Sequence, residues 1–211
     1  PYDDLLSGGK EANTGLYHFG EEKDFGFTPK NHVELAESLG LIDYKRAAKI
    51  SGTGTWVYTN LGARLEWALL NYFIECHLAD GYAMVLPPHI LNYESGYTAG
   101  QFPKFQEDVF WLEGMEPRKF ILPTAETAFV NLHRDEILSL NDLPRKYFAY
   151  TPCYRKEAGS YRTEERGMIR GYQFNKVEMV QYTTQEGSDA AFDEMVKKAQ
   201  KLLEGLGLNS Q

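Results

Sequence analysis

The sequence predicts an α+β protein whose mostly antiparallel sheet is flanked by helices. Helical and strand-like segments follow one another without the regular βαβ spacing that a parallel sheet requires. Two strand-like stretches, 146–155 and 168–182, flank the polar loop 158–167 and so predict a long hairpin. Aromatic residues make up 14% of the chain, which favours a substantial sheet.

Composition narrows the class of protein. The chain has 211 residues, of which 43% are hydrophobic and 25% charged, and this length suits one domain or slightly more. Such a composition is that of an ordinary globular protein and excludes a disordered or collagen-like chain. Lys plus Arg number 22 and Asp plus Glu 30, so the formal charge is 22 − 30 = −8. General nucleic-acid binding is therefore disfavoured, although a local basic patch is compatible with this total.

Cysteine usage and hydropathy bear on location. Cys76 and Cys153 are too few and too far apart to form a disulfide framework, which favours a reducing, cytoplasmic compartment. The most apolar helical stretch, 67–74, is far shorter than the ~18 residues of a membrane span, so no membrane association is expected. The chain opens with Pro1 and no signal peptide, and we expect it to begin inside a longer polypeptide.

The first half of the chain predicts a linker followed by helices. Residues 1–24 are polar and glycine-rich and predict a linker or arm that leads into a domain over 25–211. Short helices are expected at 31–39 and 44–49. The strongest helical pattern runs from 63 to 77, with apolar residues at spacings of three and four. These residues are Leu65, Leu69, Tyr72, Phe73 and Cys76.

The second half alternates strands and helices. Strands are expected at 82–86, which Pro87-Pro88 ends, and at 108–112. A helix is expected over 124–138, with Thr124 as its N-cap. A final helix begins at Ser188 and ends at Gly205.

The predicted hairpin carries an unusual set of side chains on one face. Residues of equal parity along its second strand share that face: Arg170, Tyr172, Phe174, Lys176 and Glu178. Arg155 and Glu157 share a face of the partner strand. An arginine can bind a phosphate, a glutamate can accept from an amine, and an aromatic ring offers a flat surface to a base. The face therefore suits an anionic, planar ligand, and the alternative is a solvated face with cross-strand ion pairs.

Two further observations concern the same strand. The opposite face is expected to be the packed one: Ile169, Gln173, Val177 and Met179. Gly171 would weaken the strand unless something must approach its backbone closely. This glycine favours the ligand-binding interpretation over the solvated face.

Other common sites find no support. Residues 52–57 lack the third glycine of a dinucleotide-binding loop, and no Walker-type Gly-Lys-Ser/Thr occurs. Cys76 and His77 are adjacent on a predicted helix and point apart, which disfavours a zinc site. Ser160 has no partnered histidine nearby in the sequence, so no nucleophilic triad is predicted.

The hairpin resembles a known motif. Segments that resemble motif 2 of seryl-tRNA synthetase, a class II aminoacyl-tRNA synthetase, are 154–160, 166–170 and 173–178. Residues 122–126, Leu-Pro-Thr-Ala-Glu, are similar to the serine-binding Thr-Ala-Glu loop of that family. The stretch 62–88 resembles motif 1, and the resemblance covers about residues 25–205 in order. It implies a class II synthetase fold that is incomplete at the C-terminus.

The resemblance implies binding sites for ATP. Arg155 would be the catalytic residue, because it would hold the α-phosphate of ATP and of the adenylate. Phe174 would stack on the adenine ring, and the Gly171 backbone would lie beside the nucleotide. Glu157 would contact the adenine side, and Lys156 is assigned to the same site.

The resemblance also implies sites for the other substrates. Thr124, Ala125 and Glu126 would bind L-serine, and Glu178 would hold its amino group. Residues of the motif 2 loop implied to contact ATP or the acceptor end of tRNA(Ser) are Ser160, Arg162 and Arg166. Motif 1 would build a homodimer interface, with Pro88 at the end of its strand.

The implied reaction is that of a serine–tRNA ligase. Serine would be activated by ATP to seryl-adenylate and then transferred to tRNA, without a protein nucleophile. The family continues with motif 3 and an acidic Mg²⁺ site, so the magnesium ligands are expected outside this chain. Alternatives are an amino-acid-activating relative that uses a non-tRNA acceptor, or a non-catalytic paralogue or fragment.

Overall fold

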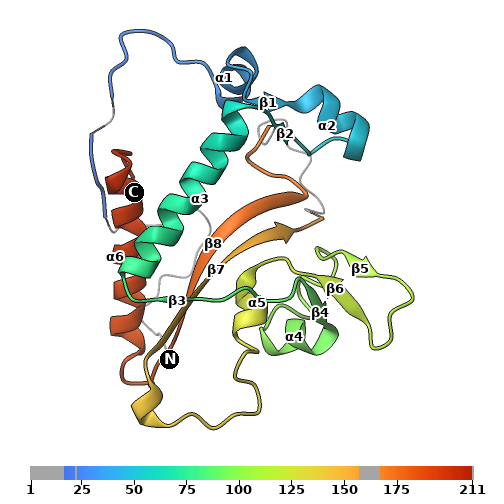
Figure 1. The fold of residues 1–211 in the computed structure, drawn as a ribbon, viewed down its shortest axis with the longest axis vertical. Coiled ribbons are helices and arrows are strands. Elements are labelled where there is room, and N and C mark those ends of the chain that lie inside the picture. The colour runs from blue at the N-terminus through green and yellow to red at the C-terminus, as the bar shows by residue number, and fades with distance from the viewer. Residues whose placement is uncertain (1–16, 22, 157–166, 211) are drawn as a thin grey trace. The chain divides into compact units, whose positions relative to one another are not determined.

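The computed structural model describes residues 17–21, 23–156 and 167–210 and divides the chain into two compact units (Figure 1). One unit joins the residues up to Thr28 with Asp189–Gln211 and contains most of α6 (Ser188–Gly205). Within it, Phe19 pairs with Ser210 in an antiparallel bridge. The other unit, Pro29–Ser188, contains every element discussed below. The sequence-based division into 1–24 and 25–211 stays a prediction.

The main sheet of the second unit has the order β3-β7-β8. β7 (Arg145–Tyr154) and β8 (Gln173–Tyr182) form the predicted hairpin, paired antiparallel with Cys153 opposite Phe174. β3 (Ala83–Met84) runs parallel to β7. Antiparallel pairs therefore predominate among the described strands, as the sequence predicts, and one parallel pair is added.

A second sheet, of order β4-β6-β5, supplies much of the core. It consists of β4 (Ile90–Asn92), β6 (Lys119–Ile121) and β5 (Trp111–Leu112), all paired antiparallel. Its buried side chains form a cluster with residues of the neighbouring segments: Leu91, Phe102, Val109, Phe120, Leu122 and Cys153. Phe174 of β8 packs against this cluster, so the aromatic ring of the hairpin face is fixed by the core beneath it.

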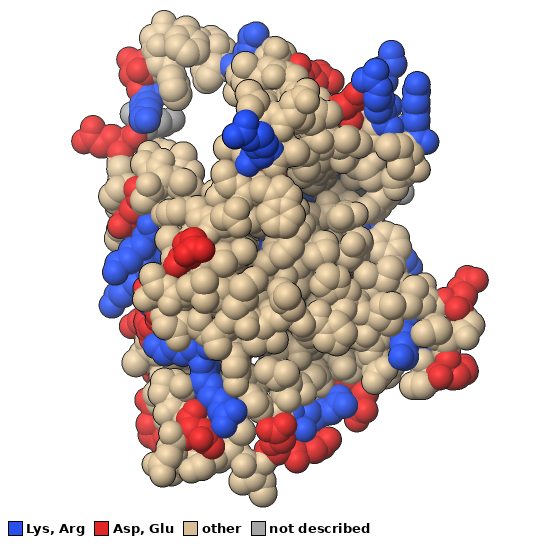
Figure 2. Space-filling model, in the orientation of Figure 1, with Lys and Arg blue, Asp and Glu red and all other residues tan. Residues whose placement is uncertain are grey.

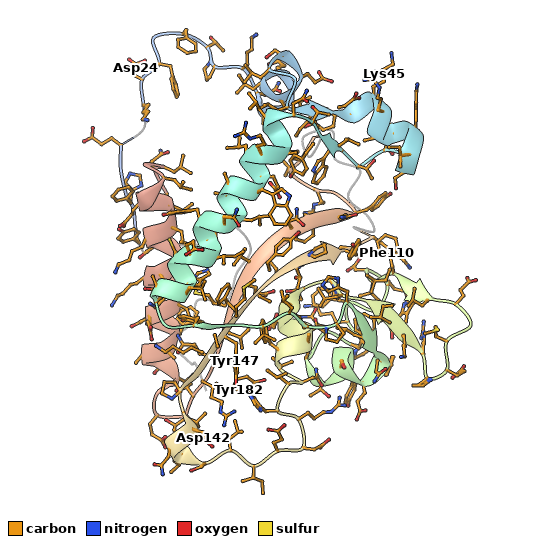
Figure 3. The ribbon with its side chains drawn as sticks, in the orientation of Figure 1. Asp24, Lys45, Phe110, Asp142, Tyr147 and Tyr182 are labelled. Carbon is orange, nitrogen blue, oxygen red and sulfur yellow. The ribbon has the colours of Figure 1, made fainter. Side chains whose placement is uncertain are left out.

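A helix packs against one face of the hairpin. α3 (Leu61–Ala79) contacts β8, where Asn175 Nδ2 donates to Glu66 Oε1 at 3.0 Å. Asn175 has the opposite parity to Phe174, so α3 covers the face of β8 that does not carry Phe174. Gln173, expected on the packed face, is exposed. Toward the other end of the hairpin, the rings of Tyr147 and Tyr182 meet edge to face, with centroids 6.1 Å apart (Figure 3).

Short helices and a small two-stranded sheet precede α3. α1 (His32–Ser38) begins with a capping box, in which Asn31 accepts from Glu34 N and the Glu34 carboxylate accepts from Asn31 N. β1 (Ile42–Asp43) pairs with β2 (Val57–Tyr58), and α2 (Tyr44–Ser51) connects these two strands along the chain.

The helix expected over 124–138 is wrong in extent. α5 (Ala125–Phe129) ends early, and a 3₁₀ turn at Leu140–Asp142 precedes β7. Asn131 Nδ2 donates to Thr127 O at 2.9 Å, and Asp135 adopts a φ of +64°, which a helix does not permit. α4 (Tyr93–Thr98) packs against α5.

Within the described part of the chain, no helix has the length and apolar character needed to cross a membrane.

Candidate active site

A cavity of about 350 Å³ lies where the start of α5 meets the middle of β8. Most of its lining residues are polar or charged, and it is called the polar cavity below. Its lining residues are Gln101, Phe105, Asp108, Val109, Pro123, Thr124, Glu126, Arg155, Lys176 and Glu178. The cavity contains side chains from the Thr-Ala-Glu segment and from the hairpin, and two of these, Thr124 and Glu178, are 54 positions apart in the sequence. The fold therefore brings together residues that the sequence assigned to one ligand.

Thr124 is the centre of the hydrogen-bond network in this polar cavity. It is 5% exposed, and its Oγ1 lies 2.9 Å and 2.8 Å from the two carboxylate oxygens of Glu178. Lys176 Nζ donates to the same Oγ1 at 2.6 Å and forms an ion pair with Glu178 Oε1 at 3.1 Å. The hydroxyl thus accepts from the ammonium and donates to the carboxylate, which fixes the orientation of all three groups.

This network explains a difference from the sequence-based expectation for Thr124. The residue occupies the N-cap position of α5, but its side chain makes no capping hydrogen bond. Instead Glu178 Oε2 accepts from the backbone N–H of Glu126 at 3.2 Å, so a carboxylate from another strand serves the first turn of the helix. Ala125, between these two, is fully buried, and the Glu126 side chain is exposed at the cavity.

Arg155 lies just beyond the end of β7 and lines two cavities. Its Nε donates to Pro123 O at 3.1 Å, and its guanidinium carbon lies 5.2 Å from the centroid of the Phe174 ring. The ring contact is a cation–π arrangement, and the carbonyl bond holds one edge of the planar group. Arg155 is therefore positioned between the polar cavity and its neighbour.

The neighbouring cavity, called the aromatic cavity below, has a volume of about 400 Å³. Its lining residues are Trp56, Arg155, Met168, Ile169, Arg170, Gly171 and Phe174. Aromatic rings from Trp56 and Phe174 combine with the guanidinium groups of Arg155 and Arg170. This combination suits a planar base that carries an anionic group. A third cavity, of about 680 Å³ and largely apolar, shares Trp56 and Phe174 with it.

The structure corrects part of the strand-parity argument. Phe174, Lys176 and Glu178 belong to β8 and do lie on one face, as predicted. β8 begins at Gln173, however, so the alternation does not extend to residues 168–172. Arg170 lines the aromatic cavity, whereas Tyr172 lines the apolar cavity and its ring packs edge-on against Phe110.

Irregular backbone also changes the positions of two other residues. Ile169, expected on the packed face, is 62% exposed. Gly171 is buried, and a Cβ there would lie only 2.2 Å from Trp56 Cζ3. The space that a side chain would fill is therefore taken by the Trp56 ring, whatever ligand lies beside the glycine backbone.

The remaining predicted site residues are located as follows. Lys156 is half-buried and its backbone N–H donates to Asp108 O at 2.8 Å, next to the polar cavity. Pro88 is exposed between β3 and β4 and lines none of the three cavities. Four predicted residues lie outside the described residues: Glu157, Ser160, Arg162 and Arg166.

Burial disfavours Cys153 as a nucleophile. Cys153 lies opposite Phe174 in the hairpin, and burial is the main cause that raises the pKa of its thiol. A thiol with a raised pKa stays protonated near neutrality and is a poor nucleophile. Among the described residues, no group of three or more His, Cys, Asp or Glu side chains is placed to hold a metal ion. We therefore assign no residue described here to a metal.

Sequence reasoning missed two residues of the site. Lys176 was placed on the correct face but given no role, although it donates to the central hydroxyl. Trp56 has no assigned role in the sequence analysis, and it forms a wall of the aromatic cavity. The glycine at position 171 was the available signal for Trp56, because it indicated a close approach without saying by what.

The two-sheet α+β fold is that of the class II aminoacyl-tRNA synthetases, as comparison with known proteins shows. A family model, the tRNA synthetase class II core domain (G, H, P, S and T), matches residues 110–211. The structure also superposes on a cytoplasmic serine-tRNA ligase from Naegleria fowleri in complex with AMP. That comparison has a TM-score of 0.91 over 97% of this chain and 49% of the other, and at 23% identity it shows the fold alone.

Closer relatives identify the family within this class. The chain is 63% identical to serine–tRNA ligase 2 of Clostridium acetobutylicum, over 99% of this chain and 50% of the relative. It is 32% identical to seryl-tRNA synthetase from Pyrococcus horikoshii complexed with ATP, with a TM-score of 0.79 over 84% of this chain and 39% of that one. The chain belongs to the seryl-tRNA synthetase family. It spans about half the length of the curated relatives that it matches.

Proposed function

We propose that this chain supplies the amino-acid and ATP sites of a serine–tRNA ligase. The observation that carries the proposal is that Arg155 lines both the polar cavity and the aromatic cavity beside it. An amino acid in the first and a nucleotide in the second would meet at this guanidinium. Relatives named serine–tRNA ligases, and a related structure complexed with ATP, support the same assignment.

The polar cavity is proposed as the L-serine site. Glu178 would hold the substrate amino group, and Thr124 with Ala125 and Glu126 would bind the rest of this small amino acid. The network among Thr124, Lys176 and Glu178 offers charged and hydroxyl partners at fixed positions. A site whose polar groups pair with a substrate hydroxyl rejects analogues that lack it, because those groups would be left unpaired.

The aromatic cavity is proposed as the ATP site. Phe174 would stack on the adenine, with the Gly171 backbone beside the nucleotide. Arg155 would bind the α-phosphate, and its cation–π contact with Phe174 holds the guanidinium beside the ring. Glu157 and Lys156 are proposed as further contacts, by their position in motif 2.

The chemistry needs no protein nucleophile. A carboxylate oxygen of serine attacks the α-phosphorus of ATP, and pyrophosphate leaves with the bonding electron pair. A terminal ribose hydroxyl of tRNA then attacks the seryl carbonyl, and AMP leaves. Arg155 would stabilise the negative charge that develops on the α-phosphate, and positioning would supply much of the remaining acceleration. Magnesium would accompany ATP, and no step is assigned to it here.

Partners and location complete the proposal. Ser160, Arg162 and Arg166 of the motif 2 loop would contact ATP or the acceptor end of tRNA(Ser), although the chain as a whole carries a formal charge of −8. A cytoplasmic location is proposed because both cysteines are free and dispersed.

A homodimer is proposed through the motif 1 region. Few charged side chains lie over α3 and β3 in Figure 2. Exposed apolar residues of this region are Leu61, Leu65, Trp67 and Leu86. Exposed apolar surface of this kind is typical of an interface, and Pro88 lies in the segment between β3 and β4. A two-fold axis would place these residues against the same region of a second copy.

Serine-dependent exchange of pyrophosphate into ATP tests the proposed activation step. The measurement uses the complete gene product that carries residues 1–211, with ATP, Mg²⁺, labelled pyrophosphate and L-serine. Exchange that depends on serine, and that alanine or threonine supports poorly, is the expected result. Exchange supported equally by an unrelated amino acid would contradict the serine assignment. Transfer to tRNA(Ser) is then measured separately, because a non-tRNA acceptor would leave exchange intact.

A further inference from the structure

A histidine from the first helix contacts the segment that forms one wall of the aromatic cavity. The backbone N–H of Met168 donates to His32 Nε2 at 3.2 Å, across 136 positions in the sequence. Gly167, one residue earlier, has a φ of +81°, and a Cβ there would lie 2.3 Å from the same nitrogen. The imidazole therefore lies directly against the backbone at this point.

The histidine is itself held in place. His32 is the first residue of α1, whose N-terminus is closed by the capping box between Asn31 and Glu34. A ring nitrogen that accepts a hydrogen bond is unprotonated, so the neutral imidazole must carry its proton on Nδ1. A rigid helix start thus presents one acceptor to one backbone donor.

The segment is also fixed at its other end. Tyr172 N donates to Gly54 O at 3.3 Å, and Tyr172 O accepts from Arg155 N at 3.0 Å. The Trp56 ring fills the space over Gly171. Between these contacts, residues 168–171 form no strand and depend on outside partners for their conformation.

The contact with His32 is therefore well placed to act on the nucleotide site without touching the ligand. Met168, Ile169, Arg170 and Gly171 all line the aromatic cavity, whereas His32 lines none of the three cavities described. Loss of the acceptor would leave the Met168 N–H without its partner and would allow this wall to move. The polar cavity shares only Arg155 with the aromatic one and has no residue from this segment.

We propose that His32 is a positioning residue for the ATP site, because it fixes residues 168–171 through the Met168 N–H. This inference rests on the proposed function, in which the aromatic cavity binds ATP. It extends that function by assigning a role to the N-terminal helix, which contributes no side chain to the cavity. The effect should appear in ATP binding and not in serine binding.

The test compares His32→Ala and His32→Gln in the complete gene product. The Gln side chain places an amide oxygen at about the reach of the imidazole Nε2 and can accept from Met168 N, whereas Ala cannot. His18→Ala, at an exposed histidine of the other unit, is the matched control. The readouts are the KM values for ATP and serine in pyrophosphate exchange, and deuterium uptake at residues 167–172.

His32→Ala should raise the KM for ATP by about five- to tenfold, as expected for one lost hydrogen bond, with less than about a twofold change for serine. It should also speed deuterium uptake at residues 167–172, and Gln should restore both readouts. If the wild type exchanges normally but His32→Ala changes neither the KM for ATP nor uptake, the inference is wrong. Equal losses for both substrates that Gln does not rescue would likewise overturn it, as a merely structural role. Absence of serine-dependent pyrophosphate exchange in the wild type would instead count against the proposed function. Deuterium uptake at residues 167–172 would still report on the His32 contact.

Discussion

The Thr124 hydroxyl oxygen, at the start of a helix, lies 2.9 Å and 2.8 Å from the two carboxylate oxygens of Glu178, in the middle of a strand. The hydroxyl oxygen also accepts from Lys176. Because a hydroxyl has one proton, it can donate fully to only one of the two oxygens at a time. The other oxygen accepts from the ammonium or from the Glu126 N–H, so each group of this cavity has a defined partner.

Replacement of Thr124 by Val should disrupt this network at nearly constant volume. Val removes the acceptor of Lys176 and a donor to Glu178 at a buried position, so the free energy of unfolding should fall by about 1–3 kcal/mol. Urea denaturation measures this change. Thr124→Ser keeps the hydroxyl and should lose clearly less; equal losses for Val and Ser would mean that packing of the methyl group, and not the hydroxyl, is what matters.

Glu178→Gln should raise the KM for serine at least about tenfold while that for ATP changes by less than about twofold. The amide retains the shape of the carboxylate but lacks the charge that a substrate ammonium would pair with, and charged hydrogen bonds contribute more than neutral ones. Pyrophosphate exchange at varied substrate concentrations measures both constants. Glu113→Gln, at an exposed turn after β5, is the control, and an equal effect on both substrates would argue against a role at the amino group.

Arg155→Ala should abolish serine-dependent exchange. The substitution removes the guanidinium that lines both cavities, along with its contacts to Pro123 O and the Phe174 ring. Loss of one preorganised charge at a reacting phosphate typically costs on the order of 10²–10³ in rate. Arg145→Ala, at the opposite end of the same strand, should leave exchange within about twofold. Near-normal exchange in Arg155→Ala would refute its proposed position at the α-phosphate.

Alkaline pH should destabilise the protein partly through Tyr58. Burial, and then the nearby carboxylate of Glu66, raises the pKa of Tyr58 to about 12 from 10.0. The folded state therefore holds the phenolic proton more tightly than the unfolded chain. This stabilisation is fully present below the unfolded pKa of 10.0 and is lost as pH rises from there through the folded pKa.

Urea denaturation at pH values of about 9 and 11.5 measures this loss. Tyr58→Phe should lose less of its free energy of unfolding between these two conditions than the wild type does. Tyr97→Phe, at a residue that is 64% exposed, should behave like the wild type. Because Tyr58 is only partly buried, solvent screens the effect and a modest difference is expected. No difference between Tyr58→Phe and wild type would contradict the assignment.

The sequence predicted the parts of this site that depend on local periodicity. Phe174, Lys176 and Glu178 lie on one face because a strand alternates strictly, and the hairpin was recognisable from its polar loop. The extent of the helix after Thr124 was not predictable, because it depends on Asn131 side-chain bonds to Thr127 O and to Ser95 O.

Contacts between distant parts of the chain were also beyond local patterns. His32 and Met168 are in contact although they are 136 positions apart, and no pattern in the sequence around either residue predicts this contact. Trp56 reaches Gly171 in the same way, and only the missing side chain at the glycine gave a sign of it. Such pairings are set by tertiary packing, which periodicity in one segment does not contain.

The backbone of β8 fixes the distances between the residues proposed to contact the ligand. Alternate residues along a strand are spaced by about 6.7 Å, so Phe174 and Glu178 are about 13 Å apart with Lys176 midway. That length is set by covalent backbone geometry and cannot be adjusted by repacking side chains. The pairing of β8 with β7, from Arg145 opposite Tyr182 to Tyr154 opposite Gln173, holds β8 in one register. A slip of one residue in this register would turn all three side chains to the opposite face of the sheet. The register therefore determines where a base on Phe174 and an amino group on Glu178 would lie.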